Sequence, residues 1–145
     1  MELNQVLHFY KGKRIFVTGH TGFKGSWLLY LLDSAGAIVT GYSLAPQTTP
    51  SLFKSLKFSN NITSVHGDIR NIEDLELIGE FDVLVDASAE PSVTSGLDNN
   101  PNFVINNNLY GSINCFNLCL KYNAKLVFVS TSRVYPINEL NNISF

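Results

Sequence analysis

Short apolar runs alternate along the chain with longer segments in which helix-forming residues dominate. The short runs are rich in β-branched and aromatic residues and have few polar interruptions, which is typical of strands buried on both faces of a parallel sheet. Strands are therefore expected over residues 13–18, 37–44, 61–66, 82–87 and 125–130. Helices are expected between several of them, over residues 26–35 and 71–78, and from about Phe103 to Tyr122.

Local signals mark where these helices begin and end. Gly36 follows the first helix as a C-cap glycine would, and Asn71 is placed to cap the second, with acidic residues in the turn that follows. Residues 45–51 contain two prolines and are expected to form a loop. Alternating strands and helices joined by right-handed crossovers predict an α/β fold with a doubly wound parallel sheet, Rossmann-like, in the strand order 3-2-1-4-5.

The composition favours one globular domain. With 45% hydrophobic and 15% charged residues, the chain is able to bury a core, and we expect a single domain over residues 1–145. The formal net charge is -2 and no basic run is present, so no nucleic-acid partner is expected. A polar segment precedes the first apolar run, which predicts no signal peptide, and the apolar run 27–32 is too short to cross a membrane. We therefore expect a cytoplasmic protein that does not bind membranes.

Cys115 and Cys119 are the two cysteines, and their spacing of four places them one turn apart on one face of the last predicted helix. Because no second pair accompanies them, they do not form a recognisable metal site, and no bound metal is expected. We expect small buried thiols in a reduced protein.

The segment VTGHTGFKGSWL, residues 17–28, carries three glycines spaced three apart, at Gly19, Gly22 and Gly25. A Walker loop is excluded because Lys24 precedes Gly25, whereas that loop requires a glycine followed by lysine. Between a strand and a helix, Gly19 permits a tight turn, Gly22 lets the backbone approach a pyrophosphate, and Gly25 allows close packing of the helix. The helix N-terminus then offers free N–H groups to phosphates. The segment predicts dinucleotide binding, with a purely structural turn as the alternative.

The position of the expected ribose contact is less typical. Dinucleotide-binding folds usually have Asp or Glu near the end of the second strand, about 20 residues after the glycines. Here residues 41–44 are Gly-Tyr-Ser-Leu, with neither a carboxylate nor an arginine. Ser43 or a backbone group is left to contact a ribose hydroxyl, and these residues do not decide between NAD and NADP.

Several motifs together resemble one family. TGHTGFKG, GDIR at residues 67–70, and Ser-Thr at residues 130–131 followed by Val-Tyr resemble the extended short-chain dehydrogenase/reductase family of nucleotide-sugar epimerases and dehydratases. The first half resembles the CDP-glucose 4,6-dehydratase subfamily, whereas DASAEPSV and STSRVYP in the second half resemble the CDP-paratose 2-epimerase subfamily. In the former subfamily the second strand also lacks the acidic residue and the cofactor is NAD, so the resemblance implies NAD.

The resemblance implies a cofactor site, position by position. The backbone that would hold the pyrophosphate belongs to Gly19, Thr21, Gly22, Phe23 and Lys24. Asp68 would accept from the adenine amino group, and Ile69 would pack on the adenine ring. The middle of the cofactor would be lined by Ala87, Ser88 and Ala89. Alternatively, Asp68 only caps a turn, and residues 87–89 are ordinary small residues at a strand end.

Three further positions follow from the same resemblance. Asn108, in NLYGS, matches the family's Asn in its N-V-x-G-T element, although it also lies in an Asn-rich stretch where it is open to a helix-surface role. Ser130 and Thr131 would face the nicotinamide end, with Thr131 as the catalytic candidate. In dehydratases of this family an acidic residue and then Glu or Lys follow, whereas here Ser132 and Arg133 follow. Neither side chain has a pKa suited to donating a proton near neutral pH.

The family's base is a tyrosine whose pKa is lowered by a lysine four residues later. None of the six tyrosines has a lysine at that position, and Tyr135 precedes the place where the pair is expected. We therefore expect a dinucleotide-binding domain that is incomplete at its C-terminus and lacks a substrate domain. It would be the NAD-binding portion of a CDP-hexose 4,6-dehydratase or epimerase and would not be catalytic alone.

Other interpretations stay open. The chain would take a nucleotide-sugar substrate only in a complete enzyme, and it would form homo- or hetero-oligomers. Alternatively it is a non-catalytic dinucleotide-binding module or pseudoenzyme that pairs with another chain. A third possibility is a structural fragment that no longer binds cofactor.

Overall fold

The computed structural model describes residues 3–92, 94–97, 100–131 and 141–142. Its centre is a parallel sheet in the order β3-β2-β1-β4-β5, as the sequence predicts. The strands are β1 (Arg14–Thr18), β2 (Ile38–Ser43), β3 (Ile62–His66), β4 (Val83–Asp86) and β5 (Lys125–Phe128). From β1 the chain adds strands β2 and β3 on one side and then β4 and β5 on the other. The boundary between β1 and β4 is therefore a topological switch point, where ligands bind in folds of this type.

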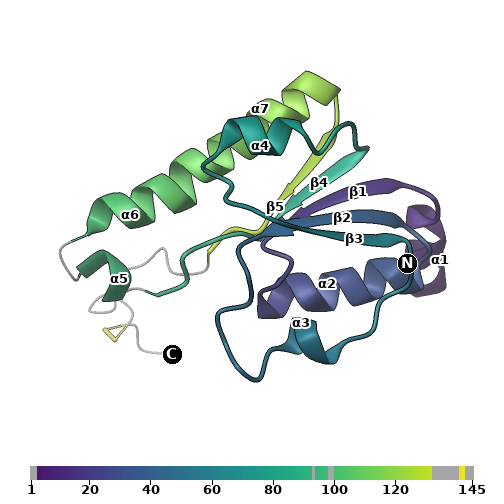
Figure 1. The fold of residues 1–145 in the computed structure, drawn as a ribbon, viewed down its shortest axis with the longest axis horizontal. Helices are drawn as coiled ribbons and strands as arrows, with labels where there is room; N and C mark the ends of the chain where they lie inside the picture. The colour runs from purple at the N-terminus through teal and green to yellow at the C-terminus, as the bar shows by residue number, and fades with distance from the viewer. Residues whose placement is uncertain (1–2, 93, 98–99, 132–140, 143–145) are drawn as a thin grey trace.

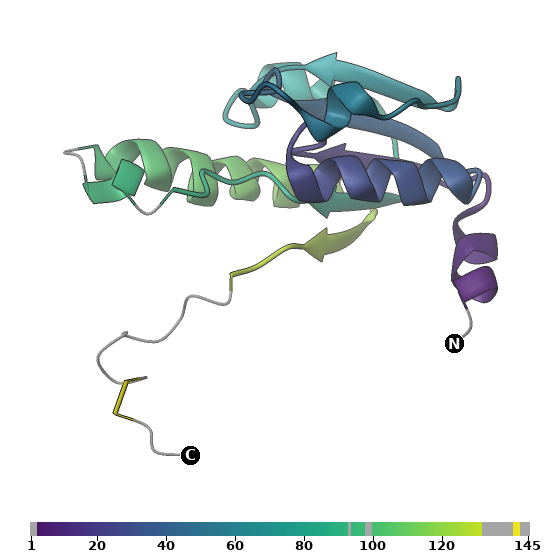
Figure 2. The ribbon, with the colours of Figure 1, turned by 90° about the horizontal axis from the view of Figure 1, so that it is seen from below.

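Helices cover both faces of the sheet (Figure 1). One layer contains α1 (Leu3–Tyr10), α2 (Phe23–Ser34) and α3 (Leu52–Ser55), and the other contains α4 (Ile72–Glu76) and α7 (Gly111–Tyr122). The short helices α5 (Thr94–Leu97) and α6 (Pro101–Ile105) and the π-helical turn η1 (Asn106–Tyr110) precede α7 and extend past the sheet (Figure 2).

Buried side chains of β1 contribute in turn to the two helical layers, because successive side chains of a strand point to opposite faces of the sheet. Ile15 and Val17 pack with Leu29 and Leu32 of α2, whereas Phe16 packs with residues from the layer of α4 and α7. The core of the second layer consists of Phe16, Tyr42, Ile69, Leu75, Phe81, Leu84, Cys115, Leu118 and Cys119. Both cysteines are buried and free, as predicted, and burial raises the pKa of the Cys115 thiol.

The predicted helix boundaries are partly confirmed. Asn71 caps α4, and its side chain accepts hydrogen bonds from the N–H groups of Glu73 and Asp74. Gly36 ends α2 with φ +72°. The start of α2 was predicted wrongly, because the helix begins at Phe23 and not at residue 26. Since the backbone of the glycine segment already turns into the helix, Gly25 lies inside the first turn despite its low helix propensity.

The helix predicted from Phe103 to Tyr122 is not continuous. It begins at Pro101, where the Asn100 side chain accepts from the Phe103 N–H at 3.1 Å, and it passes through the π-helical turn η1 before α7. The short helices α1, α3 and α5 were not predicted, because segments of four to eight residues carry little periodic signal.

The far edge of the sheet is incompletely covered. Leu126, Val127 and Phe128 of β5 are between 38% and 47% exposed, although strands of parallel sheets are usually buried on both faces. None of the helices in the described ranges is long and apolar enough to span a membrane.

Candidate functional site

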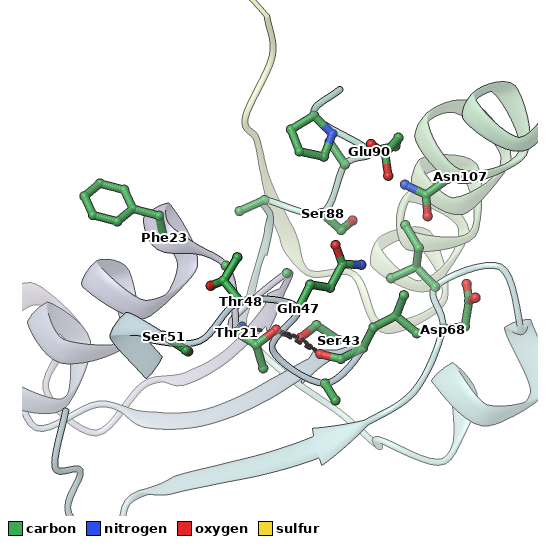
Figure 3. A pocket seen from close by; sticks show the side chains of 18 of the residues that line it. Thr21, Phe23, Ser43, Gln47, Thr48, Ser51, Asp68, Ser88, Glu90 and Asn107 are labelled. Carbon is green, nitrogen blue, oxygen red and sulfur yellow. Dashed lines mark hydrogen bonds between the residues drawn. The ribbon is translucent and has the colours of Figure 1, made fainter. Parts of the chain in front are cut away.

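A pocket of about 430 Å³ opens at the carboxyl ends of the strands (Figure 3). Its walls come from the segments that follow β1, β2, β3 and β4, with Phe103 and Asn107 from α6 and η1. Most of the predicted cofactor residues line it, namely Gly19, Thr21, Gly22, Phe23, Ser43, Asp68, Ile69, Ala87, Ser88 and Ala89. Folding therefore brings together residues that are up to 70 positions apart in the sequence.

The glycine loop has the geometry that its sequence predicts. Gly19 has φ +69°, and a Cβ there would lie 2.5 Å from the Ala87 carbonyl oxygen. A Cβ at Gly25 would collide with the carbonyl of Gly19 and the Cα of His20, so this glycine lets α2 begin directly against the loop. Both positions therefore require glycine for steric reasons that the surrounding backbone imposes.

The N-terminus of α2 is open to the pocket. Its N-cap is Gly22, which supplies no side-chain cap, and the first N–H groups of a helix have no acceptor within the helix. Ser26 donates to the carbonyls of Gly22 at 2.7 Å and His20 at 3.1 Å, which holds the loop against the helix. Uncapped N–H groups and the positive end of the helix dipole favour a bound anion such as a phosphate.

At the end of β2, Ser43 is hydrogen-bonded to the glycine loop. Its Oγ lies 2.8 Å from Thr21 Oγ1 and accepts from the Thr21 N–H at 3.3 Å (Figure 3). Thr21 Oγ1 also lies 2.8 Å from the Leu44 carbonyl oxygen, to which it is positioned to donate. Uncharged hydroxyl groups thus occupy the place where a carboxylate is usual.

Asp68 follows β3 and lines the pocket while pairing with Arg70. Its Oδ1 accepts from Arg70 Nε at 2.9 Å and from the Arg70 N–H at 2.9 Å. The Arg70 guanidinium holds the pKa of the Asp68 carboxyl below its usual range, so the group is ionised near neutral pH. A carboxylate retains lone pairs after accepting these bonds, so a contact with an adenine amino group stays a prediction that the geometry permits.

At the end of β4, a cluster of buried polar side chains around Asp86 supports the pocket wall that contains Ser88. Asp86 is fully buried, and its Oδ1 accepts from Thr18 Oγ1 at 2.6 Å and from Ser88 Oγ at 2.5 Å. The same oxygen accepts from the Ser88 N–H at 3.1 Å, while Oδ2 accepts from Ser112 Oγ at 2.7 Å. Asp86 therefore connects β1, the turn after β4 and α7, and it positions Ser88 in the pocket wall.

Asn108 lies next to this wall but is not among the residues that line the pocket. Its Oδ1 accepts from the Glu90 N–H at 2.7 Å, and its Nδ2 donates to the Glu90 carbonyl at 3.2 Å. The side chain that lines the pocket is that of Asn107, which donates to Asn108 Oδ1 at 2.9 Å. A direct contact of Asn108 with the cofactor stays a prediction. The structure shows that its side chain is hydrogen-bonded to the backbone of Glu90, in the loop after β4.

Other predicted residues lie outside the pocket lining. Lys24 is exposed on the first turn of α2, and Ser130 and Thr131 are exposed beyond β5. The positions considered after Thr131, which are Ser132, Arg133 and Tyr135, lie outside the described residues. Within the part of the chain that is described, no group of three His, Cys, Asp or Glu side chains is arranged to hold a metal ion.

Sequence reasoning missed a large part of the wall that follows β2 and β4. The missed residues include Gln47, Thr48, Ser51, Glu90, Phe103 and Asn107. The available signal for Gln47 and Thr48 was their place in the loop that follows β2 at the carboxyl edge, because loops at that edge surround the ligand in open α/β sheets.

His20 belongs to the glycine loop but is not among the residues that line the pocket. It is fully buried, its Nε2 lies 2.7 Å from Ser64 Oγ, and its ring packs edge-on against Phe53. A Cβ at Gly41 would lie 2.5 Å from His20 Cγ, so that glycine makes room for the ring. The hydrogen bond between His20 and Ser64 therefore joins the glycine loop to β3.

The buried His20 is expected to make stability depend on pH. Burial disfavours the imidazolium and lowers the pKa of His20 to about 4, below its ordinary value in the unfolded chain. The unfolded state therefore binds more protons at mildly acidic pH. The contribution of neutral His20 to the free energy of unfolding is present above pH 6.5 and is lost as the pH falls toward 4. Between pH 7 and 5, the free energy of unfolding measured in urea should fall by about 2 kcal/mol more for wild type than for His20→Asn. Equal losses in the two proteins would show that His20 does not titrate in this way.

Comparison with known proteins agrees with this geometry. The sequence pattern of the "NAD dependent epimerase/dehydratase family" matches residues 15–143, which is most of the chain. The chain belongs to that family. Two relatives in this epimerase/dehydratase family are enzymes of nucleotide sugars by their names. CDP-glucose 4,6-dehydratase of Salmonella typhimurium is 48% identical over 89 residues, covering 59% of this chain and 25% of that protein. UDP-glucose 4-epimerase of Pisum sativum is 29% identical over 133 residues, covering 85% of this chain and 38% of that protein.

Solved structures of family-like epimerases have the same fold. Epimerase Mth375 of Methanothermobacter thermautotrophicus is 25% identical with a TM-score of 0.79, covering 90% of this chain and 38% of that one. The Bordetella bronchiseptica enzyme WbmH, solved in complex with NAD⁺, is 25% identical with a TM-score of 0.68, covering 88% of this chain and 43% of that one. The chain thus spans between about a quarter and two fifths of the length of these family relatives.

Proposed function

We propose that this chain is the NAD-binding portion of a nucleotide-sugar 4,6-dehydratase or epimerase, with a CDP-hexose as the substrate class. The observation that carries the proposal is the glycine loop, which runs from β1 into the uncapped N-terminus of α2 beside an open pocket. A Cβ at Gly19 would strike the backbone after β4, so this close approach is built into the fold. Such a loop suits the diphosphate of a dinucleotide.

The other walls suit the remaining parts of NAD. The diphosphate would lie against the backbone of residues 19–24, the adenine near Asp68 and Ile69, and the adenosine ribose near Ser43. The centre of the cofactor would contact Ala87, Ser88 and Ala89, with Ser130 and Thr131 toward the nicotinamide. When bound, NAD supplies a hydride acceptor for a sugar carbon. The chain's own residues would bind and orient the cofactor, and Thr131 is the candidate for contact with the reacting sugar.

The substrate class is inferred from the relatives. The 48% identity with CDP-glucose 4,6-dehydratase supports a CDP-linked hexose, although it extends over only 59% of this chain. None of the six tyrosines is followed by lysine at the fourth position, so we propose that the chain does not turn over a sugar by itself. A cytoplasmic location belongs to the same proposal.

A second candidate is a non-catalytic NAD-binding module that pairs with another chain. The observation in its favour is the exposed apolar surface of Leu126, Val127 and Phe128 on β5. A partner that covers this edge would co-purify with the chain and would reduce the exposure of these three side chains.

Calorimetric titration with NAD tests the main proposal. We expect one NAD per chain with micromolar or tighter affinity, and no 4-keto sugar after incubation with NAD and CDP-glucose. A flat titration would overturn the proposal and favour a structural fragment. Formation of the 4-keto sugar would overturn the claim that the chain is not catalytic alone, while leaving NAD binding intact.

A further inference from the structure

The side chain of His20 crosses from the glycine loop to β3. In the sheet, β2 lies between β1 and β3 (Figure 1). His20 comes shortly after the end of β1, yet its Nε2 lies 2.7 Å from Ser64 Oγ, which belongs to β3. The imidazole therefore passes over β2 and connects the loop after β1 to a strand that is not its neighbour.

Gly41 of β2 makes room for this crossing. A Cβ at Gly41 would lie 2.5 Å from Cγ, 2.6 Å from Cδ2 and 2.9 Å from Cβ of His20. In the register of the sheet, Gly41 pairs with Ser64, so the residue under the ring is the direct neighbour of the residue that the ring contacts. Glycine weakens the interior of a strand and often marks the close approach of another group. We call His20, Gly41 and Ser64 the loop brace.

The backbone at His20 leads directly into the N-terminus of α2. The Gly22 N–H donates to the Gly19 carbonyl at 3.1 Å, which closes a turn around His20, and Ser26 Oγ donates to the His20 carbonyl at 3.1 Å. The ring itself is fully buried and packs edge-on against Phe53. Because closely packed interiors transmit displacements, a shift of the ring also moves the N–H groups in the first turn of α2.

We propose that His20 is a positioning residue for dinucleotide binding, and that the loop brace holds the glycine loop so that the first N–H groups of α2 point toward the diphosphate. This inference rests on the proposed function, because the diphosphate is that of the proposed dinucleotide. His20 is not among the residues that line the pocket, so it acts through the backbone and not by contact with the ligand. A loop that already has its binding conformation loses less conformational entropy when the ligand binds.

Calorimetric titration with NAD tests the loop brace from both of its ends. His20→Ala should weaken NAD binding by ~10-fold and Ser64→Ala by ~5-fold, as expected for the loss of one hydrogen bond and of preorganisation. The double variant should bind NAD no more weakly than His20→Ala, because both substitutions remove the same contact. Ser64 is exposed on β3, so Ser64→Ala is expected to fold and carries this test if His20→Ala does not.

Cys119→Ala separates positioning from a general loss of stability. Cys119 is buried in the core of the opposite layer, away from the glycine loop. Its substitution should lower the melting temperature and leave the affinity for NAD unchanged. A loss of NAD affinity in Cys119→Ala as large as that in His20→Ala would show that reduced stability alone explains the effect, and would overturn the inference.

Gly41→Ala tests whether the ring over β2 is the decisive contact. In wild type the added methyl group would strike the ring, so NAD binding should weaken by ~10-fold or more. In the His20→Gly background neither the ring nor its Cβ is present, so Gly41→Ala should change the affinity by no more than ~2-fold.

Equal effects of Gly41→Ala in the two backgrounds, or wild-type affinity in folded His20→Ala and Ser64→Ala, would overturn the inference and leave the proposed function standing. Failure of wild type to bind NAD would overturn both.

Discussion

Replacing Gly19 by alanine is expected to abolish NAD binding and to lower the free energy of unfolding by about 3 kcal/mol. The residue has φ +69°, which an L side chain adopts only at a cost. The added methyl group would also lie 2.5 Å from the oxygen and 2.7 Å from the carbon of the Ala87 carbonyl. Both neighbours are backbone atoms, so relief requires the glycine loop and the turn after β4 to separate, which distorts two walls of the pocket.

Gly12→Ala is the matched control for this substitution. Gly12 has a closely similar φ of +70°, but a Cβ there would meet nothing within 4 Å. The free energy of unfolding of Gly12→Ala should fall by about 1 kcal/mol because of backbone strain alone, and this variant should bind NAD as wild type does. Urea unfolding and calorimetry measure the two effects. If both variants lose the same stability and keep NAD binding, the close approach of Gly19 to Ala87 has no part in the site.

Replacing Asp86 by alanine is expected to destabilise the protein by about 3 kcal/mol and to weaken NAD binding. Asp86 is fully buried and accepts hydrogen bonds from the hydroxyls of Thr18, Ser88 and Ser112 and from the Ser88 N–H. Its removal leaves these donors buried without an acceptor. Ser88 also lines the pocket, so the turn that contains it loses its position.

Asp86→Asn serves as the conservative comparison. The amide oxygen is able to accept the three bonds that Oδ1 accepts, and the amide nitrogen then faces Ser112, whose hydroxyl rotates to accept. This variant should recover most of the stability and NAD affinity that alanine loses. Glu80→Ala, at an exposed carboxylate near Arg14, should stay close to wild type in urea unfolding. Equal stability of Asp86→Ala and wild type would show that the buried cluster does not hold the pocket wall.

The sheet was predictable because each strand carries its own signal. In β1, four of five residues are buried, and such apolar runs are typical of parallel strands whatever lies elsewhere in the chain. The start of α2 was not predictable in the same way, because Gly22 and Gly25 have low helix propensity and the turn depends on tertiary contacts. The π-helical turn at Asn106–Tyr110 was also not predicted, and its Asn108 side chain accepts a hydrogen bond from the Glu90 N–H in the loop after β4, a tertiary contact that no local pattern encodes.

Some residues of the candidate site were predictable from the sequence, and others depend on how the chain folds. The positions of Gly19, Ser43, Asp68 and Ala87 follow from the rule that ligands bind at the carboxyl ends of parallel strands. Ser51 was missed because it lies eight residues beyond β2, and a loop's path is not encoded in a local pattern. Asp86 was missed because its role depends on Thr18 and Ser112, which approach it only in the folded chain.

A structure of the protein determined with NAD bound tests the central claim most directly. The account predicts the diphosphate oxygens within hydrogen-bond distance of the N–H groups at the start of α2, with the adenosine ribose beside Ser43. A cofactor held elsewhere, or a diphosphate that makes no contact with the backbone of residues 21–24, would contradict it.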